Sequence, residues 1–200
     1  MDRREALKRT ALTLGFAISS PAILAVLNGC KPTPELTYSP QFFTRPQALL
    51  ISELSEIILP KTSTPGAKDV GVPGFIDELI KSAYPKEEQE KFIKGLTEFD
   101  EEAKQTEGDS FAELDREKQI AFVKKHHDKA LASSSNSGAK GWWNTGSAED
   151  KPFILKVKEL TILGFFTSKI GATQVLQYNP VPGPFKGCVP LAQVGRAWAT

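Results

Sequence analysis

The segment Pro152–Phe166, PFILKVKELTILGFF, is the most apolar of the helices that this 200-residue sequence predicts. Proline suits the first turn of a helix, and apolar residues then cover most of the helix circumference. We expect such a helix to be buried within the domain or in an interface with a partner. The chain has no run of alternating strands and no internal repeat, so we predict an all-α fold of about five helices in a single domain.

Four amphipathic helices are predicted before this segment. The first follows Thr44, which resembles an N-cap with Gln47 at the capping-box position. The other three are expected near residues 73–84, 85–108 and 115–131. Apolar residues expected on these helices are Leu50, Leu54, Ile57, Ile58, Phe75, Ile76, Leu79, Ile80, Phe92, Leu96, Phe99, Ala103, Ile120, Phe122, Val123 and Ala130.

Three regions lack helical periodicity. Residues 62–74 are rich in turn-forming residues, and residues 132–151 form a Ser/Gly-rich loop that contains Trp142 and Trp143. From Gly171 onward four prolines exclude long regular structure. We therefore expect an irregular, Pro/Gly-rich C-terminal segment after the last helix.

The first 29 residues have the pattern of an export signal. Arg3 and Arg4 resemble a twin-arginine pair, and the apolar run that follows is shorter than the roughly 20 residues of a membrane-spanning helix. The run ends in Leu-Asn-Gly-Cys, which resembles a lipobox with Cys30 as the lipidated residue. An ordinary signal with a chance cysteine is the alternative. We predict a signal over 1–29, a Pro-rich tether over 30–43 and a helical domain over 44–200.

The charge balance gives no reason to expect nucleic-acid binding. After residue 29 the chain has 21 basic and 22 acidic residues, so it is close to neutral. Cys30 and Cys188 are the only cysteines. With Cys30 lipidated, Cys188 has no partner within the chain, and we expect it to be buried as a small apolar group. A disulfide to another chain is the alternative.

No catalytic or cofactor motif stands out, and we do not expect the chain to be catalytic alone. His126 and His127 are adjacent, so their side chains point about 100° apart on a helix and cannot share a metal as an i, i+4 pair could. A structural role is expected for both. Glu53 and Glu56 could do acid–base chemistry if they were buried, as could the acid pairs Asp77–Glu78 and Glu101–Glu102. The sequence has no c-type haem motif and no dinucleotide-binding glycine fingerprint.

Two long strings resemble the gluconate 2-dehydrogenase subunit 3 family. One is ILPKTSTPGAKDVGVPGFID, which ends the stretch from Ala48 to Asp77. The other is FILKVKELTILGFFTSKIGATQVLQYNPVPGPFKGC, from Phe153 to Cys188. The resemblance extends from about Leu49 to Trp198 and is weakest across residues 132–151.

The resemblance implies a non-catalytic small subunit of a periplasmic, membrane-associated dehydrogenase that oxidises sugars or sugar acids. In this family a large flavoprotein of the GMC type holds FAD, and a cytochrome c subunit often takes the electrons. The small subunit is thought to aid export, maturation and stability of the large one. The lipobox-like Cys30 adds a lipid anchor on the periplasmic side, and Lys31 after it slightly favours the outer membrane.

Partner contacts are expected in the two Pro/Gly-rich stretches, 64–74 and 171–188, and at the tryptophan pair. The residues chosen as contacts are Pro65, Gly66, Val72, Trp142, Trp143, Pro182 and Phe185. The alternative function is a stand-alone lipoprotein that binds a small ligand or acts through buried carboxylates such as Glu53 and Glu56.

Overall fold

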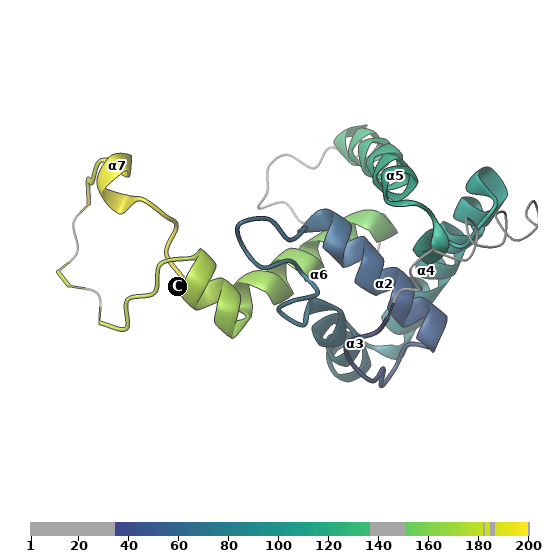
Figure 1. The fold of residues 1–200 in the computed structure, drawn as a ribbon, viewed down its shortest axis with the longest axis horizontal. Coiled ribbons are helices and arrows are strands. Elements are labelled where there is room, and N and C mark those ends of the chain that lie inside the picture. The colour runs from purple at the N-terminus through teal and green to yellow at the C-terminus, as the bar shows by residue number, and fades with distance from the viewer. Residues whose placement is uncertain (1–34, 137–150, 182, 185–186, 200) are drawn as a thin grey trace, which may run out of the picture. The chain divides into compact units, whose positions relative to one another are not determined.

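The computed structural model describes residues 35–136, 151–181, 183–184 and 187–199. In these residues there is no β-strand, and the all-α prediction with about five helices is confirmed. The long helices are α2 (Arg45–Ile58), α3 (Val72–Ala83), α4 (Lys86–Glu107), α5 (Arg116–Asn136) and α6 (Phe153–Thr167) (Figure 1). Shorter elements are the 3₁₀ helix η1 (Phe111–Glu113), the π-helical turn η3 (Gly171–Val175) and α7 (Leu191–Val194).

The helix ends follow the local signals in the sequence. At the start of α2 the backbone N–H of Thr44 donates to Oε1 of Gln47 at 2.9 Å, as the capping box predicts. Helix α4 ends at Gly108, whose φ of 92° favours glycine. Helix α5 runs to Asn136, so the first residues of the stretch predicted as a loop are helical.

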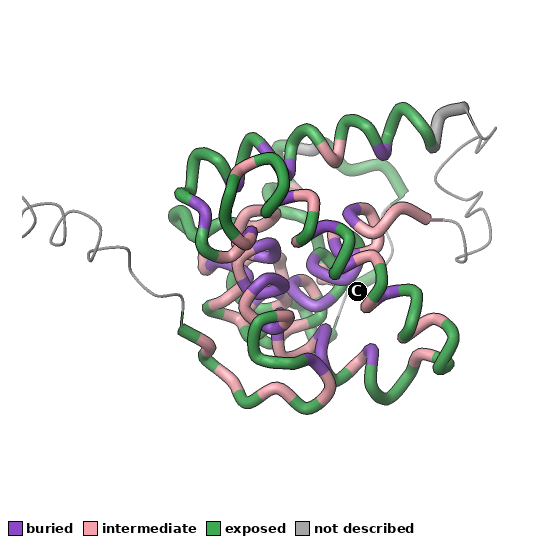
Figure 2. The backbone as a smooth tube through the Cα atoms, turned by 90° about the vertical axis from the view of Figure 1, so that its right-hand side faces the viewer, coloured by how far each residue is buried: buried purple, intermediate pink, exposed green. Residues whose placement is uncertain are grey.

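Helix α6 is the centre of the packing, because it contacts α2, α3, α4 and α5. Gly164 allows α3 to come close, since a Cβ atom there would lie 2.5 Å from Cδ1 of Phe75. The inward face of α6 consists of Ile154, Val157, Leu160, Thr161, Gly164 and Phe165. Figure 2 shows the buried backbone positions gathered in the interior of the helical part.

Several large apolar side chains stay on the surface. On α6, Ile162 and Leu163 are 38% and 48% exposed, so only part of this apolar helix is buried within the domain. On α5, Ile120 is 48% exposed, which corrects its predicted place among the inward apolar residues. Within the described residues, no helix has both the length and the hydropathy needed to cross a bilayer.

Residues 36–43, which were predicted to belong to a tether, pack on the domain. Phe43 is buried, and Leu36, Tyr38 and Phe42 pack against the core. The carboxylate of Asp77 in α3 holds this segment by accepting hydrogen bonds from the backbone N–H groups of residues 41, 42 and 43. The packed domain therefore begins before the predicted boundary at residue 44.

Candidate functional site

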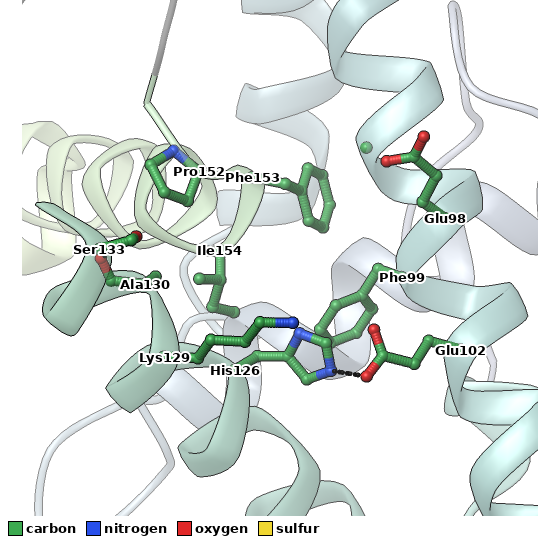
Figure 3. A pocket seen from close by; sticks show the side chains of 11 residues that line it. Glu98, Phe99, Glu102, His126, Lys129, Ala130, Ser133, Pro152, Phe153 and Ile154 are labelled. Carbon is green, nitrogen blue, oxygen red and sulfur yellow. Dashed lines mark hydrogen bonds and ion pairs between the residues drawn. The ribbon is translucent and has the colours of Figure 1, made fainter.

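A cavity of about 260 Å³ lies between α4, α5 and the start of α6 (Figure 3). Glu98 and Glu102 line it from α4, and His126 and Lys129 line it from α5. The remaining lining residues are Gly95, Phe99, Ala130, Ser133, Pro152, Phe153 and Ile154. The cavity thus combines aromatic and aliphatic walls with charges of both signs.

His126 is the least solvated titratable side chain of this cavity. Its ring packs against both Phe99 and Phe122, with centroid distances of 5.0 Å and 4.4 Å. Its Nε2 lies 3.4 Å from Oε1 of Glu102 and forms no hydrogen bond to any described residue. This packing agrees with the structural role predicted for His126.

The surroundings of His126 favour the neutral imidazole. Burial lowers the pKa of His126 below its ordinary value, and the nearby carboxylate of Glu102 opposes this lowering. The ammonium groups of Lys125 and Lys129 add to the lowering. Within the described residues, no group of three His, Cys, Asp or Glu side chains is placed to hold a metal ion.

The buried His126 predicts that the free energy of unfolding falls as the pH drops below about 6.5, the ordinary pKa of histidine. In that range the unfolded chain binds a proton that the folded chain, with its lower His126 pKa, does not yet bind. His126→Phe should remove this part of the pH dependence while it keeps an aromatic ring in place. Urea unfolding at pH 7.5, 6.5 and 5.5 measures the effect.

The adjacent histidine provides the control for this experiment. His127→Gln leaves His126 in place, so the part of the pH dependence that His126 causes should persist. An unchanged pH dependence in His126→Phe would show that other groups cause it.

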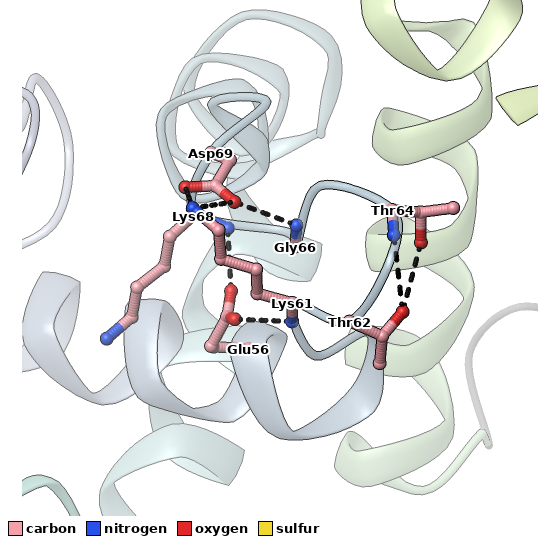
Figure 4. A network of polar contacts seen from close by, with 7 residues as sticks. All are labelled: Glu56, Lys61, Thr62, Thr64, Gly66, Lys68 and Asp69. Carbon is pink, nitrogen blue, oxygen red and sulfur yellow. Dashed lines mark hydrogen bonds and ion pairs between the residues drawn. The ribbon is translucent and has the colours of Figure 1, made fainter. Parts of the chain in front are cut away.

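The carboxylate of Glu56 joins the two sides of the loop between α2 and α3 (Figure 4). Glu56, in the last turn of α2, accepts a hydrogen bond from the backbone N–H of Lys61 at 2.9 Å on Oε1. Its Oε2 accepts from the backbone N–H of Lys68 at 3.0 Å. Glu56 therefore joins both sides of the loop, and hydrogen bonds to a charged acceptor are the stronger kind.

Further ion pairs hold the same loop. Oδ2 of Asp69 accepts from the backbone N–H of Gly66 at 3.0 Å, and Lys61 Nζ lies 3.1 Å from the same oxygen. The backbone hydrogen bond from Gly66, with the contact to Lys61, lowers the pKa of Asp69. On α2, Glu53 accepts from Lys68 Nζ at 2.5 Å. Glu53 and Glu56, the proposed acid–base pair, thus both have partners within this loop.

Gly66→Ala is expected to destabilise the fold by about 1–3 kcal/mol, the usual cost of overpacking. A Cβ at Gly66 would lie 2.4 Å from Oε1 of Glu56 and 2.7 Å from the backbone nitrogen of Lys61, so the closure of the loop must shift. Urea unfolding followed by circular dichroism measures the loss. Gly74→Ala is the matched control, because its Cβ would make only ordinary contacts with Tyr38. Equal stabilities for the two variants would contradict the tight closure.

The structure places the predicted contact residues unevenly. Pro65 is half-buried, Gly66 is buried against Glu56, and Val72 is fully buried. Because Gly66 and Val72 are buried, a partner cannot contact them directly. The predicted contact role does not hold for these two residues. Seven predicted residues lie outside the described part of the chain: Arg3, Arg4, Cys30, Trp142, Trp143, Pro182 and Phe185. Cys188 is an exposed free thiol, which corrects its expected burial.

Glu56 and Asp77 anchor the backbone, a role that was not predicted from the sequence. A signal was present for Glu56, since an acid at the end of a helix directly precedes a loop rich in turn residues. For Asp77 no local signal exists, because its partners lie more than 30 positions away in the sequence.

The sequence matches a known protein family. The sequence model of the gluconate 2-dehydrogenase subunit 3 family matches residues 45–183, which include helices α2 to α6 and the loop closed by Glu56. No curated protein and no solved structure matches the chain.

Proposed function

Because the chain belongs to the gluconate 2-dehydrogenase subunit 3 family, we propose that it is a non-catalytic accessory subunit of a membrane-bound, FAD-dependent dehydrogenase. The family description is that of a subunit of a dehydrogenase complex, so a dehydrogenase is its partner. In this proposal the larger partner holds FAD and oxidises a sugar or sugar acid, and a cytochrome c subunit is a further electron carrier.

The observation that carries the proposal is the apolar surface of α6. This helix buries one face against four other helices, yet Ile162 and Leu163 remain exposed on its outer side. Clustered apolar side chains on a surface are typical of protein interfaces. A subunit of a complex has a partner to cover them.

The proposal includes a location and a route. Arg3 and Arg4 are proposed to direct export, and the lipidated Cys30 is proposed to anchor the complex on the periplasmic side of a bacterial membrane. The accessory subunit would thereby aid export, maturation and anchoring of the flavoprotein.

The alternative, a stand-alone lipoprotein that acts through buried carboxylates, has less support. Glu53 and Glu56 are engaged with Lys68 and with backbone N–H groups of the loop, so neither acid is free for proton transfer. The cavity at His126 is the feature that remains in its favour.

Co-purification tests the proposed function. The full-length chain with a C-terminal tag is extracted from membranes of its own host with a mild detergent and isolated. We expect a stoichiometric partner with a flavin absorbance spectrum and dye-linked dehydrogenase activity on a sugar or sugar acid. Isolation of the chain without a flavoprotein, or turnover by the chain alone, would contradict the proposal.

Cys30→Ala is expected to move most of the chain from the membrane fraction to the soluble periplasmic fraction, because the acyl chains that hold it can no longer be attached. Immunoblotting of separated fractions measures the distribution. Cys188→Ala is the matched control, since it removes the other cysteine and should leave the chain in the membrane fraction. Membrane retention of Cys30→Ala equal to that of wild type would argue against the lipid anchor.

A further inference from the structure

A second hollow, the α2–α5–α6 groove, has an aliphatic wall and a polar edge. Helix α2 contributes Ile57 and Ile58, α5 contributes Ile120 and Val123, and α6 contributes Ile154. The volume is about 250 Å³, which accommodates one or two side chains rather than a whole helix. Because Ile120 is 48% exposed, the wall of the groove is open to water in the isolated chain.

Two ammonium groups, those of Lys124 and Lys158, lie at the edge of this groove beside His127, whose Nδ1 is 3.6 Å from Oδ1 of Asp128. Lys124 and His127 of α5 and Lys158 of α6 complete its lining. Lys158 Nζ lies 2.9 Å from Nε2 of His127, and because an ammonium has only donors, it donates to the ring nitrogen. Neither Lys124 nor Lys158 forms an ion pair with a carboxylate in the described part of the chain. By contrast Lys156, on the same helix, is paired with Glu88 at 3.0 Å.

We propose that the α2–α5–α6 groove is a docking site for the dehydrogenase partner and receives an aliphatic side chain that lies next to a carboxylate in the partner. This inference rests on the proposed function, which supplies the partner. The aliphatic wall indicates the aliphatic side chain of the occupant. The ammonium groups of Lys124 and Lys158, which have no carboxylate partner among the described residues, indicate its carboxylate.

Charge complementarity selects an acidic segment over a purely apolar one. A neutral aliphatic segment would cover the groove and leave the ammonium groups of Lys124 and Lys158 less hydrated without a counter-charge, which is costly. A carboxylate at the edge offsets this cost and orients the partner. The attraction between these ammonium groups and the carboxylate also favours an acidic partner surface over a neutral or basic one.

The exposed face of α6 begins one turn beyond Lys158, which lines the groove. Ile162 follows Lys158 by four residues, so the two side chains lie on the same side of the helix. Ile162 is 38% exposed and extends the aliphatic surface by one turn. A partner that fills the groove would therefore also cover part of the apolar surface of α6.

The test reverses the charges at the edge of the groove. The tagged full-length chain carrying Lys124→Glu and Lys158→Glu is produced in its own host, and the co-purifying dehydrogenase is measured by flavin absorbance and dye reduction per tagged chain. We expect at least tenfold less dehydrogenase than with wild type. Raising the salt concentration should weaken the wild-type complex, because the contact includes exposed charges.

Matched controls separate docking from folding and from general charge effects. Lys81→Glu with Lys94→Glu makes the same charge change at exposed positions of α3 and α4 that do not line the groove, and recovery should stay within twofold of wild type. Ile120→Asn tests the aliphatic wall and should lower recovery at least threefold. Circular dichroism and thermal unfolding verify that each variant is folded.

The possible outcomes distinguish the two proposals. If the wild-type chain brings down no dehydrogenase, the proposed function itself fails. If the wild type and the charge-reversed variant recover equal amounts, the groove proposal fails and the proposed function stands. Dimerisation of the isolated wild-type chain that the charge reversal abolishes, or a fatty acid found by native mass spectrometry and lost in the same variant, would assign the groove to another occupant and overturn the inference.

Discussion

Replacing Asp77 by alanine is expected to lower the free energy of unfolding by about 3–4 kcal/mol. The carboxylate is 1% exposed and accepts hydrogen bonds from three successive backbone N–H groups. The bond from Gln41 is 2.6 Å long and the bond from Phe43 is 2.8 Å. Alanine leaves these donors without an acceptor, and an unsatisfied buried donor costs more than the net value of the bond.

The loss should spread to the start of α2, because residues 41–43 lead directly into that helix. Tyr38 lies in the same environment: burial, and then the negative charge of Asp77, raise the pKa of its hydroxyl. Removal of Asp77 would detach the segment that carries Tyr38 and Phe43 from the core. Asp77→Asn should have an intermediate effect. Its amide oxygen still accepts a hydrogen bond, but its NH2 group takes the place of the second oxygen and cannot accept one from a backbone N–H.

Urea unfolding of Asp77→Ala, followed by circular dichroism, measures this effect. Glu78→Ala is the matched control, because Glu78 is the neighbouring acid and is exposed. Its effect should stay within about 0.5 kcal/mol, the usual range for surface changes. Similar losses in the two variants would show that the carboxylate of Asp77 does not hold residues 41–43.

The second large effect is expected from Phe92→Ala, which should cost about 3–5 kcal/mol. Phe92 of α4 is 2% exposed and lies between Phe43, at a centroid distance of 5.8 Å, and Phe153, at 5.3 Å. These two rings come from the segment before α2 and from the first turn of α6. Truncation therefore leaves a cavity where three parts of the chain meet and also removes two aromatic contacts.

Chemical denaturation again gives the measurement. Phe92→Leu should lower the free energy of unfolding less than Phe92→Ala, since leucine fills more of the cavity. Leu131→Ala is the control, because Leu131 is 48% exposed and its truncation should change stability by less than about 0.5 kcal/mol. A loss in Phe92→Ala below 1 kcal/mol would mean that the rings around it collapse into the space or are not packed as described.

Part of the candidate site could be predicted from sequence. Residues 58–77 resemble the family in sequence. In the structure they form the loop that Glu56 holds closed and the first half of α3. An acid at the end of α2 signals a bond to the loop that follows, but the partners of Glu56 are backbone N–H groups, so the sequence does not say which of them it binds. In the sequence, Glu53 and Glu56 do not differ from other acids on a helix. Only the folded loop gives them their partners.

For helix α5 the sequence did not show which apolar residues face the core. Phe122 and Val123 are buried as predicted, and Ile120 is not. Its apolar residues do not fall on one narrow face, so periodicity alone does not choose which of them turn inward. That choice depends on where α2 and α6 pack.

The sequence by itself determined the helical class, the family of the chain and the ends of the long helices other than the C-terminal end of α5. These features depend on caps, prolines, glycines and apolar spacing, which act within one or two turns of the chain. Tertiary structure alone decided which acids anchor the backbone, that residues 36–43 belong to the domain, and that lysines 124 and 158 border an open aliphatic groove. Each of these features joins residues that are far apart in sequence, so it comes into existence only when the helices pack.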